Sequence, residues 1–446
     1  MLIRMESSQQ HYVGHLTEVS KNNKVILMED VFNHRGLLVV KKGAEVDKCF
    51  AQKIAKHKLF KPLDHSISLT STLNQRTSFE FFTKRLDDMQ LSDIVRHNGM
   101  YNDALEAFHL LTRYPLITQK LTVLGERMPD VLGRSLLTSV IALGLCKELK
   151  LSKQTTEDVF VAGVISNVGL LHIDPVLVTK NGQYSPDEWK LMKGHVVIGK
   201  HFADMVPSLP KVVAKAVLEH HERANGFGYP FAKHASQLGI EGQILAMVDK
   251  VSAIYQRLVK HGPYSWTSVI AVLQVPSTAH AVPLHKAMMR VLKGFSVKYE
   301  AAFTEEQFKT LVETCIEKRE RLSLWFKEFA RIYVDHKPLM LDSDSFKPLA
   351  LLHQLEHTVI NSGVLSDAQH TWLTKLPNIL GTADCLDIEE FALILDEVEY
   401  QCFFVMRKLV FAKDEVAKRF DGLELPSLYY QGLINILDPD EKKRLG

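Results

Sequence analysis

Residues 220–230 read HHERANGFGYP and join two adjacent histidines, a carboxylate and a glycine-rich turn within one short stretch. The segment before it, LPKVVAKAVLEHH, places Val213, Val217 and His220 on one helical face. The spacing therefore predicts an amphipathic helix that ends at the histidines. Turn-forming residues then break the helix, namely Asn225, Gly226 and Gly228.

The histidine pair has two interpretations. Neutral imidazoles bind divalent metals well, and a neighbouring carboxylate either joins them as a ligand or orients a ring. Consecutive helical residues point about 100° apart, so both rings serve one site only if that site lies over the helix end. Histidines in a last helical turn also stabilise its carbonyl groups. The pair alone leaves both interpretations open.

Composition describes a soluble globular protein of several domains. The 446 residues are 46% hydrophobic and 24% charged, and the net charge is +2. This balance gives no argument for binding nucleic acid or an anionic membrane. Five cysteines are scattered without a CxxC pair, which predicts reduced thiols and excludes a disulfide framework or zinc cluster: Cys49, Cys146, Cys315, Cys385 and Cys402.

Membrane and export signals are not found in the sequence. No stretch has the roughly eighteen uninterrupted apolar residues of a membrane span. The N-terminal MLIRMESSQQHYVGH has no hydrophobic signal core. We therefore expect a cytoplasmic protein without a membrane span.

The chain is predicted to be mainly α, with a small β-rich module at its N-terminus. Residues 10–65 alternate short apolar runs with turn signals and include a helix at 47–59. A Ser, Thr and Asn-rich linker follows at 69–77, and the pattern is helical from Phe79 onward. We expect four segments: a β-rich module (1–68), a linker and helical connector (69–125), a central helical domain (126–298) and a C-terminal helical domain (299–446).

The central segment contains several predicted helices. Apolar runs indicate helices at 132–149 and 159–171. Ser185, Pro186 and Glu188 form the start signal of another helix, which carries His195 about two turns in. A helix at 239–258 places Asp249 among apolar residues, where a carboxylate needs a partner.

The C-terminal segment is predicted as a helical bundle. Thr304 and Gln307 form a capping box that starts a long helix, which Pro338 closes. Further helices are predicted at 348–361, 366–376 and 388–413.

The order of these motifs resembles the HD-GYP family, the all-helical branch of the HD phosphohydrolases that hydrolyses cyclic di-GMP. The similarity covers about 170 residues, including the spacing between motifs. It implies an HD-GYP-like helical bundle and, as metal ligands, His195, His220, His221 and Asp249. It also implies a recognition turn at Asn225, Gly226, Gly228, Tyr229 and Pro230.

The resemblance fails at the family's other metal and phosphate positions. Ser166 and Asn167 replace the His-Asp doublet, and Leu170 replaces the lysine that contacts substrate phosphate in the family. Arg134 occupies the position of the family's first histidine. Asn167 supplies no negative charge and Leu170 no positive one. His172 and Asp174 follow closely but lie beyond Gly169, so we expect them to point elsewhere.

These departures predict a non-catalytic signalling protein in bacterial cyclic di-GMP pathways, because two cations without a shared carboxylate repel one another. No cofactor is expected, with a single Fe or Mn ion at the remaining ligands as the alternative. The competing hypothesis is an active or altered metal-dependent cyclic di-GMP phosphodiesterase. Partners that fit the first hypothesis are a GGDEF-domain protein, cyclic di-GMP itself and a second copy of the chain.

Overall fold

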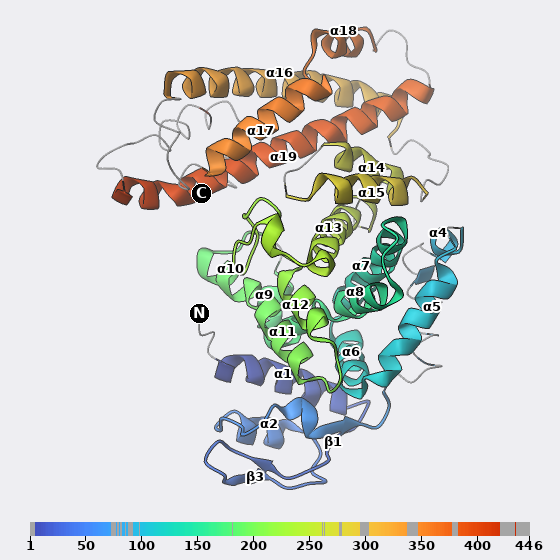
Figure 1. Ribbon diagram of the computed structural model, residues 1–446, viewed down its shortest axis with the longest axis vertical. Helices are drawn as coiled ribbons and strands as arrows, with labels where there is room; N and C mark the ends of the chain where they lie inside the picture. The colour runs from blue at the N-terminus through green and yellow to red at the C-terminus, as the bar shows by residue number, and fades with distance from the viewer. Residues whose placement is uncertain are drawn as a thin grey trace. The chain divides into compact units, whose positions relative to one another are not determined.

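The computed structural model describes residues 5–72, 77, 80, 83–84, 86–87, 92–97, 99–180, 182–260, 262, 264–275, 279–294, 303–336, 347–376, 382–419 and 433. The contacts divide the chain into two compact units (Figure 1). The first comprises residues 1–253 and 279–295, and the second comprises residues 254–278 and 296–446. The predicted boundaries of the four segments stay a prediction, and residues 73–76 of the predicted linker lie outside the described residues.

The mainly α fold is confirmed. In the first unit the N-terminal elements are α1 (Met5–Ser20), β1 (Val25–Leu27), β2 (Val31–Phe32), β3 (Leu38–Val40), α2 (Lys48–Ile54), η1 (Leu63–His65) and β4 (Ile67–Leu69). The helical part contains α4 (Ser92–His97), α5 (Tyr101–Leu110), η2 (Leu111–Arg113), α6 (Pro115–Arg127), α7 (Pro129–Glu148), α8 (Lys153–Ile165), η3 (Val168–His172), α9 (Pro175–Val178), α10 (Pro186–Lys193), α11 (His195–Met205), α12 (Lys211–Glu219), η4 (Ala235–Gln237), α13 (Ile240–Tyr255) and α15 (Val282–Lys293).

The N-terminal module contains two antiparallel strand pairs, β1 with β4 and β2 with β3. Its α2 begins at the N-cap Asp47, whose carboxylate accepts a hydrogen bond from the Phe50 amide. The interpretation of residues 10–65 as strands and turns was wrong at its start, because α1 reaches Ser20. Only part of that helix is apolar, and it gains its stability by burying Tyr12 and Leu16 against the rest of the unit.

The core of the first unit is built on α7 and α8, which pack along one another. The predicted helix at 132–149 is confirmed and begins slightly earlier, at Pro129. Among the described helices, α7 is long and apolar enough to cross a membrane, but 78% of its most apolar window is buried inside the protein. That burial is typical of the core helix of a globular domain. The predicted run 159–171 divides into the end of α8 and the short 3₁₀ helix η3.

A buried ion pair fastens the N-terminal module to the helical part. Lys120 of α6 lies 2.8 Å from Asp64 of η1, and the two side chains are only 1% and 5% exposed. The Lys120 ammonium also lies 2.9 Å from Nε2 of His172 and 3.3 Å from the centre of the Tyr12 ring. His172 in turn stacks on Tyr12, with ring centroids 4.7 Å apart. Elements from four places in the sequence thus meet at one cation.

The helix predicted to start at Ser185 ends earlier than expected. The capping box of Ser185 and Glu188 is confirmed, but α10 ends at Lys193 and His195 begins a separate helix, α11. Gly194, a weak helix former, lies at the break. Nδ1 of His195 lies 2.7 Å from the Met192 carbonyl oxygen, which fixes the ring at the helix junction.

The second unit contains the π-helical turn η5 (Gln256–Lys260), α14 (Trp266–Gln274), α16 (Glu305–His336), α17 (Lys347–Ser362), α18 (Asp367–Lys375) and α19 (Thr382–Arg419). The three long predicted helices match α16, α17 and α19, while Pro338 lies outside the described residues. Helix α19 packs against α14, α16 and α17. Lys318 of α16 pairs with Asp396 and Glu399 of α19, which ties the two longest helices together.

Candidate metal and nucleotide site

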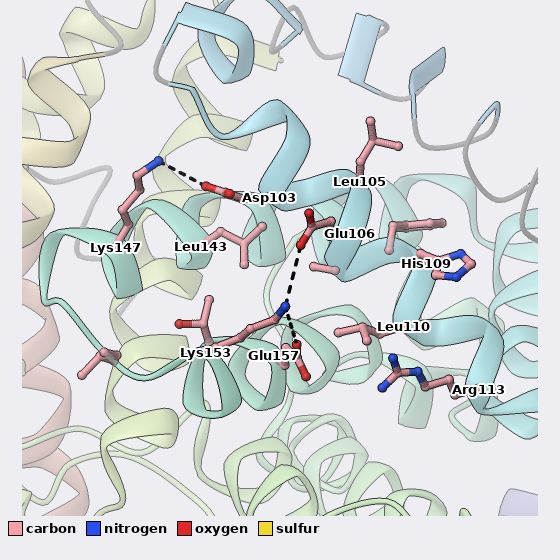
Figure 2. Close-up of a pocket in the computed structure, with 14 residues that line it drawn as sticks. Asp103, Leu105, Glu106, His109, Leu110, Arg113, Leu143, Lys147, Lys153 and Glu157 are labelled. Atoms are coloured by element: carbon pink, nitrogen blue, oxygen red, sulfur yellow. Dashed lines mark hydrogen bonds and ion pairs between the residues drawn. The ribbon is translucent and has the colours of Figure 1, made fainter.

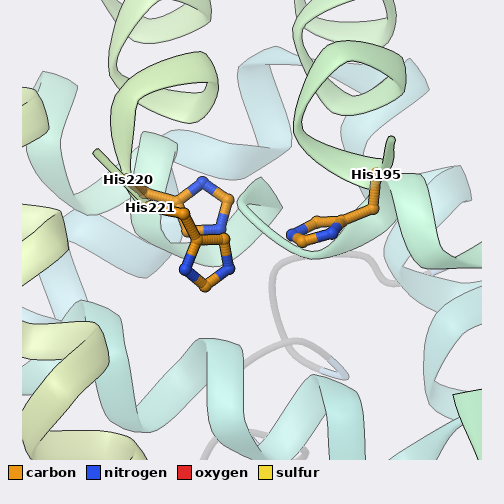
Figure 3. Close-up of side chains that lie close together, drawn as sticks. All are labelled: His195, His220 and His221. Atoms are coloured by element: carbon orange, nitrogen blue, oxygen red, sulfur yellow. The ribbon is translucent and has the colours of Figure 1, made fainter. Parts of the chain in front are cut away.

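Three predicted ligands come together in the first unit. His220 is the C-cap of α12, as the sequence predicted, and His221 follows it, while His195 begins α11. One ring nitrogen from each histidine lies within 4.8 Å of the others. Figure 3 shows the three rings turned toward one another from the ends of two helices. The alternative in which the histidines only stabilise a helix end does not explain this convergence.

The hydrogen bonds orient two of the rings for ligation. Nδ1 of His220 lies 2.6 Å from the Val217 carbonyl oxygen, as Nδ1 of His195 does from Met192 at 2.7 Å. Carbonyl oxygens accept, so each Nδ1 carries the proton and each Nε2 carries a lone pair. Both Nε2 atoms are buried and have no hydrogen-bond partner in the described part of the chain. Such nitrogens fit a divalent metal.

Burial keeps all three histidines neutral at pH 7. It lowers the pKa of His195 and of His220 to about 3, and that of His221 to about 4. The Arg134 guanidinium contributes to lowering the pKa of both His195 and His220. Neutral imidazole is the form that binds metal.

Asp249 of α13 has the partner that its apolar surroundings required. Its Oδ2 lies 3.1 Å from Nδ1 of His221 and 3.5 Å from Nη2 of Arg223. Burial by itself raises the pKa of this carboxyl, but His221, Arg223 and Arg134 hold it well below its usual range. Asp249 is therefore ionised and orients His221. Arg223 directly follows the HHE motif, but no sequence pattern predicted that it lies at the site.

The substituted positions also meet at this site. Nη2 of Arg134 donates to Oδ1 of Asn167 at 2.9 Å. The Asn167 amide donates to the hydroxyls of Ser135 and Ser166, and Ser166 donates to the Gly163 carbonyl. The Ser166 hydroxyl is thus bound within the helix end, and none of its hydrogen bonds among the described residues is to a histidine. Leu170 is buried.

Gly169 lies directly against the backbone of His195. A Cβ atom there would lie 2.1 Å from the carbonyl oxygen of His195, so a side chain does not fit between η3 and α11. His172 and Asp174 do point elsewhere. His172 contacts Lys120, and Asp174 caps α9 by accepting from the Val176 amide at 2.9 Å.

The carboxylate of the HHE motif holds the recognition turn. Glu222 is fully buried and accepts from the amides of Phe231 at 2.7 Å and Lys233 at 3.0 Å. It therefore fixes the backbone of the turn, a role that the sequence analysis did not assign. Gly228 lies so close to Glu222 that a Cβ atom would meet its Cα at 2.4 Å.

The rest of the turn places Tyr229 against the histidines. Asn225 accepts from the Phe227 amide at 3.1 Å, and Gly226 has a φ of 78°, a conformation that favours glycine. A cis peptide bond joins Tyr229 to Pro230. The Tyr229 ring stacks on His221 with centroids 4.7 Å apart, and Trp189 of α10 meets it edge-on at 5.8 Å. The sequence did not predict that Trp189 lies at this site, because its only signal was the capped helix that contains it.

A separate groove of about 1240 Å³ lies between α5, α7 and α8 (Figure 2). Two ion pairs line it, Lys147 with Asp103 at 3.2 Å and Lys153 with Glu106 at 3.9 Å. It lies toward the end of α7 opposite Arg134 and contains none of the predicted site residues.

Comparison with known proteins identifies an HD domain in this part of the chain. Residues 115–278 match the family model described as HD domain. The chain is 26% identical over 187 residues to a cyclic di-GMP phosphodiesterase of Thermotoga maritima, covering 42% of this chain and 44% of that protein. It is 25% identical over 130 residues to the 3'3'-cGAMP-specific phosphodiesterase 1 of Vibrio cholerae, covering 29% and 30%.

A third curated relative is the cyclic di-GMP phosphodiesterase response regulator RpfG of Xanthomonas campestris, 28% identical over 145 residues and covering 32% of this chain and 35% of that protein. The chain thus spans less than half the length of these curated relatives. Among solved structures, Bd1817, a HDG"Y"P protein from Bdellovibrio bacteriovorus, aligns at 12% identity with a TM-score of 0.34, covering 61% of this chain and 94% of that one.

Proposed function

We propose that this chain is a regulatory protein of cyclic dinucleotide signalling. It carries an HD domain similar to those of the HD-GYP cyclic di-GMP phosphodiesterases. In this proposal it does not cleave the nucleotide by the two-metal route. It acts by contact with a protein partner or by sensing the nucleotide.

The hydrogen bond between Arg134 and Asn167 carries the proposal. The resemblance implies a histidine ligand at the first position and a bridging aspartate at the second. This chain instead has a permanent cation bound to a neutral amide at 2.9 Å. A second metal ion beside the histidines would face the guanidinium without a bridging carboxylate, and the repulsion between the two cations would oppose its binding.

The three histidines support a competing function. His195, His220 and His221 present neutral nitrogens that fit one divalent metal, and Asp249 orients His221. A bound Mn or Fe ion would supply Lewis acidity at this position. The residual phosphohydrolase is therefore the second candidate, and it differs from the first in requiring turnover.

Metal analysis and an activity assay separate the two functions. Purified protein, loaded with Mn²⁺ or Fe²⁺ under reducing conditions, is analysed for bound metal and incubated with cyclic di-GMP and with 3'3'-cGAMP. We expect at most one ion per chain and no turnover of either nucleotide. Two ions per chain together with turnover that His220→Ala abolishes would overturn the proposal. The matched control is His109→Ala, which removes an exposed histidine of α5 outside the cluster.

The proposed protein partner is a GGDEF-domain protein that contacts the recognition turn. Phe231, next to the GYP residues, is 63% exposed and offers an apolar contact at the end of the turn. Phe231→Asp is expected to weaken binding of a purified GGDEF-domain protein in a two-component assay. Exposed Phe60, 75% accessible and in the N-terminal module, provides the matched control as Phe60→Asp. Equal binding by both variants would argue against this turn as the contact.

A further inference from the structure

The site carries positive charge of its own. Besides the histidines, the charged groups that act on the three histidine pKa values are Asp249, Arg134 and Arg223. Two of these three side chains are positive and one is negative, so their charges sum to +1. Glu222 faces the backbone of the turn instead. The histidine site therefore attracts anions before any metal binds.

Among the described residues, Arg134 forms no ion pair with a carboxylate. Oδ2 of Asp249 lies 3.5 Å from Nη2 of Arg223, whereas Nη2 of Arg134 donates its hydrogen bond to the neutral amide oxygen of Asn167. The Nε of Arg134 is buried and has no acceptor among the described residues. A guanidinium has five N–H donors, and one left without acceptors in a partly buried site is unfavourable. An anion that enters the site would satisfy these donors.

The neighbouring rings indicate the class of anion. Tyr229 stacks on His221, and Trp189 meets Tyr229 edge-on while remaining 43% exposed. The exposed ring of Trp189 provides a stacking surface for a nucleobase, as aromatic rings do in many nucleic-acid-binding sites. Guanidinium groups match the oxygens of a phosphate in a fork geometry. The combination fits a phosphate that carries a base better than free phosphate.

We infer that Arg134 anchors a metal-independent binding site for the phosphodiester of a nucleotide. The inference rests on the proposed function, since a site that holds the phosphate on a guanidinium binds the nucleotide without cleaving it. It assigns to Arg134 the positive charge that Leu170 does not provide. It also gives the pair of Arg134 and Asn167 a role in binding, because the amide holds the guanidinium in place without neutralising it.

Calorimetric titration of the full chain with cyclic di-GMP in EDTA tests the inference. We expect binding without metal, and Arg134→Gln is expected to weaken it at least about 10-fold, the effect of losing one or two charge-assisted hydrogen bonds. Arg134→Lys keeps the charge but loses the fork, so its loss is smaller. The matched control is Lys147→Gln, which removes the same charge about 20 Å along α7 and leaves binding unchanged.

A second variant works through charge alone. Asn167→Asp places a carboxylate where the amide oxygen now accepts from Arg134 at 2.9 Å, and the resulting ion pair neutralises the guanidinium. We expect it to weaken cyclic di-GMP binding in EDTA about as much as Arg134→Gln does. Thermal unfolding of each variant first establishes whether it folds. If Arg134→Gln does not fold, Asn167→Asp tests whether the charge of Arg134 contributes to nucleotide binding.

Competition with inorganic phosphate identifies what the site recognises. Weak displacement of cyclic di-GMP by millimolar phosphate is expected if the base contributes. No binding in EDTA, equal affinity of Arg134→Gln and the parent protein, or binding of inorganic phosphate as tight as that of the nucleotide would overturn the inference. Metal-dependent turnover, in contrast, bears on the proposed function alone, because the titrations contain no free metal.

Discussion

Removing the carboxylate of Asp64 tests the buried ion pair between the N-terminal module and α6. Asp64→Ala leaves the Lys120 ammonium, 1% exposed, with Nε2 of His172 and the Tyr12 ring as its neighbours. Burial lowers the pKa of Lys120, whereas Asp64 opposes that shift. Without Asp64 the lysine either stays charged in an apolar site or releases its proton. Both outcomes reduce the stability of the folded state.

The expected loss is about 3–5 kcal/mol in the free energy of unfolding, as for other buried pairs that lose one partner. A domain has only about 5–15 kcal/mol in total, so the variant unfolds at a much lower urea concentration. Equilibrium urea unfolding, followed by circular dichroism, measures this loss. The control is Asp103→Ala, which breaks an ion pair with Lys147 whose side chains are 52% and 59% exposed, and which is expected to cost less than about 1 kcal/mol.

The double variant Asp64→Leu with Lys120→Met separates charge from packing. It removes both charges while keeping apolar volume, so we expect it to recover most of the stability that Asp64→Ala loses. A loss below about 1 kcal/mol for Asp64→Ala would refute the reasoning, since no buried charge would then have been left uncompensated. So would a double variant as unstable as the single one, because the loss would then come from packing.

Further predictions concern the site. Gly169→Ala is expected to lower the free energy of unfolding, measured in urea, by about 1–3 kcal/mol, because its Cβ would lie 2.1 Å from the His195 carbonyl oxygen. The control Gly14→Ala has open space around its Cβ and is expected to be neutral or stabilising. Glu222→Gln weakens the two amide contacts of the turn, so limited proteolysis should cut the turn faster, and an unchanged rate would contradict that role. The buried histidines have pKa values of about 3–4 in the folded state, against 6.5 in the unfolded state. Between these values the unfolded state binds more protons, so the free energy of unfolding should fall by about 1 kcal/mol or more per pH unit below pH 6.5. A free energy of unfolding that stays constant from pH 6.5 to 4 would contradict this prediction.

Local sequence signals predicted what depends on local chemistry. The amphipathic spacing before His220 placed the histidine at the end of α12, and Ser185 with Glu188 placed the start of α10. The apolar run around Asp249 predicted that this carboxylate has a partner, and His221 is that partner. The end of α12 and the start of α10 are determined by residues within a few turns of one another, whereas the identity of the partner of Asp249 is not a local feature.

Other features depend on contacts between distant residues. Lys120 and Asp64 are 56 residues apart, and neither has a neighbour in sequence that predicts their burial. Arg134 and Asn167 are 33 residues apart, so only the family resemblance suggested that they share a site. The helix α1 was missed because its polar residues carry a weak apolar pattern, and tertiary packing stabilises it. The break at Gly194 was missed because one glycine does not always end a helix.

The short helix η3 has its two ends in different environments. Asn167, its N-cap, contacts Arg134, whereas His172 at its other end contacts Lys120 and stacks on Tyr12 of α1. The helix has five residues, and one of them, Gly169, packs against α11, so we expect its two ends to move together. Thermodynamic reciprocity then applies: a ligand at Arg134 that shifts η3 changes the stability of the N-terminal module, and a partner of that module changes the affinity for the ligand by the same factor.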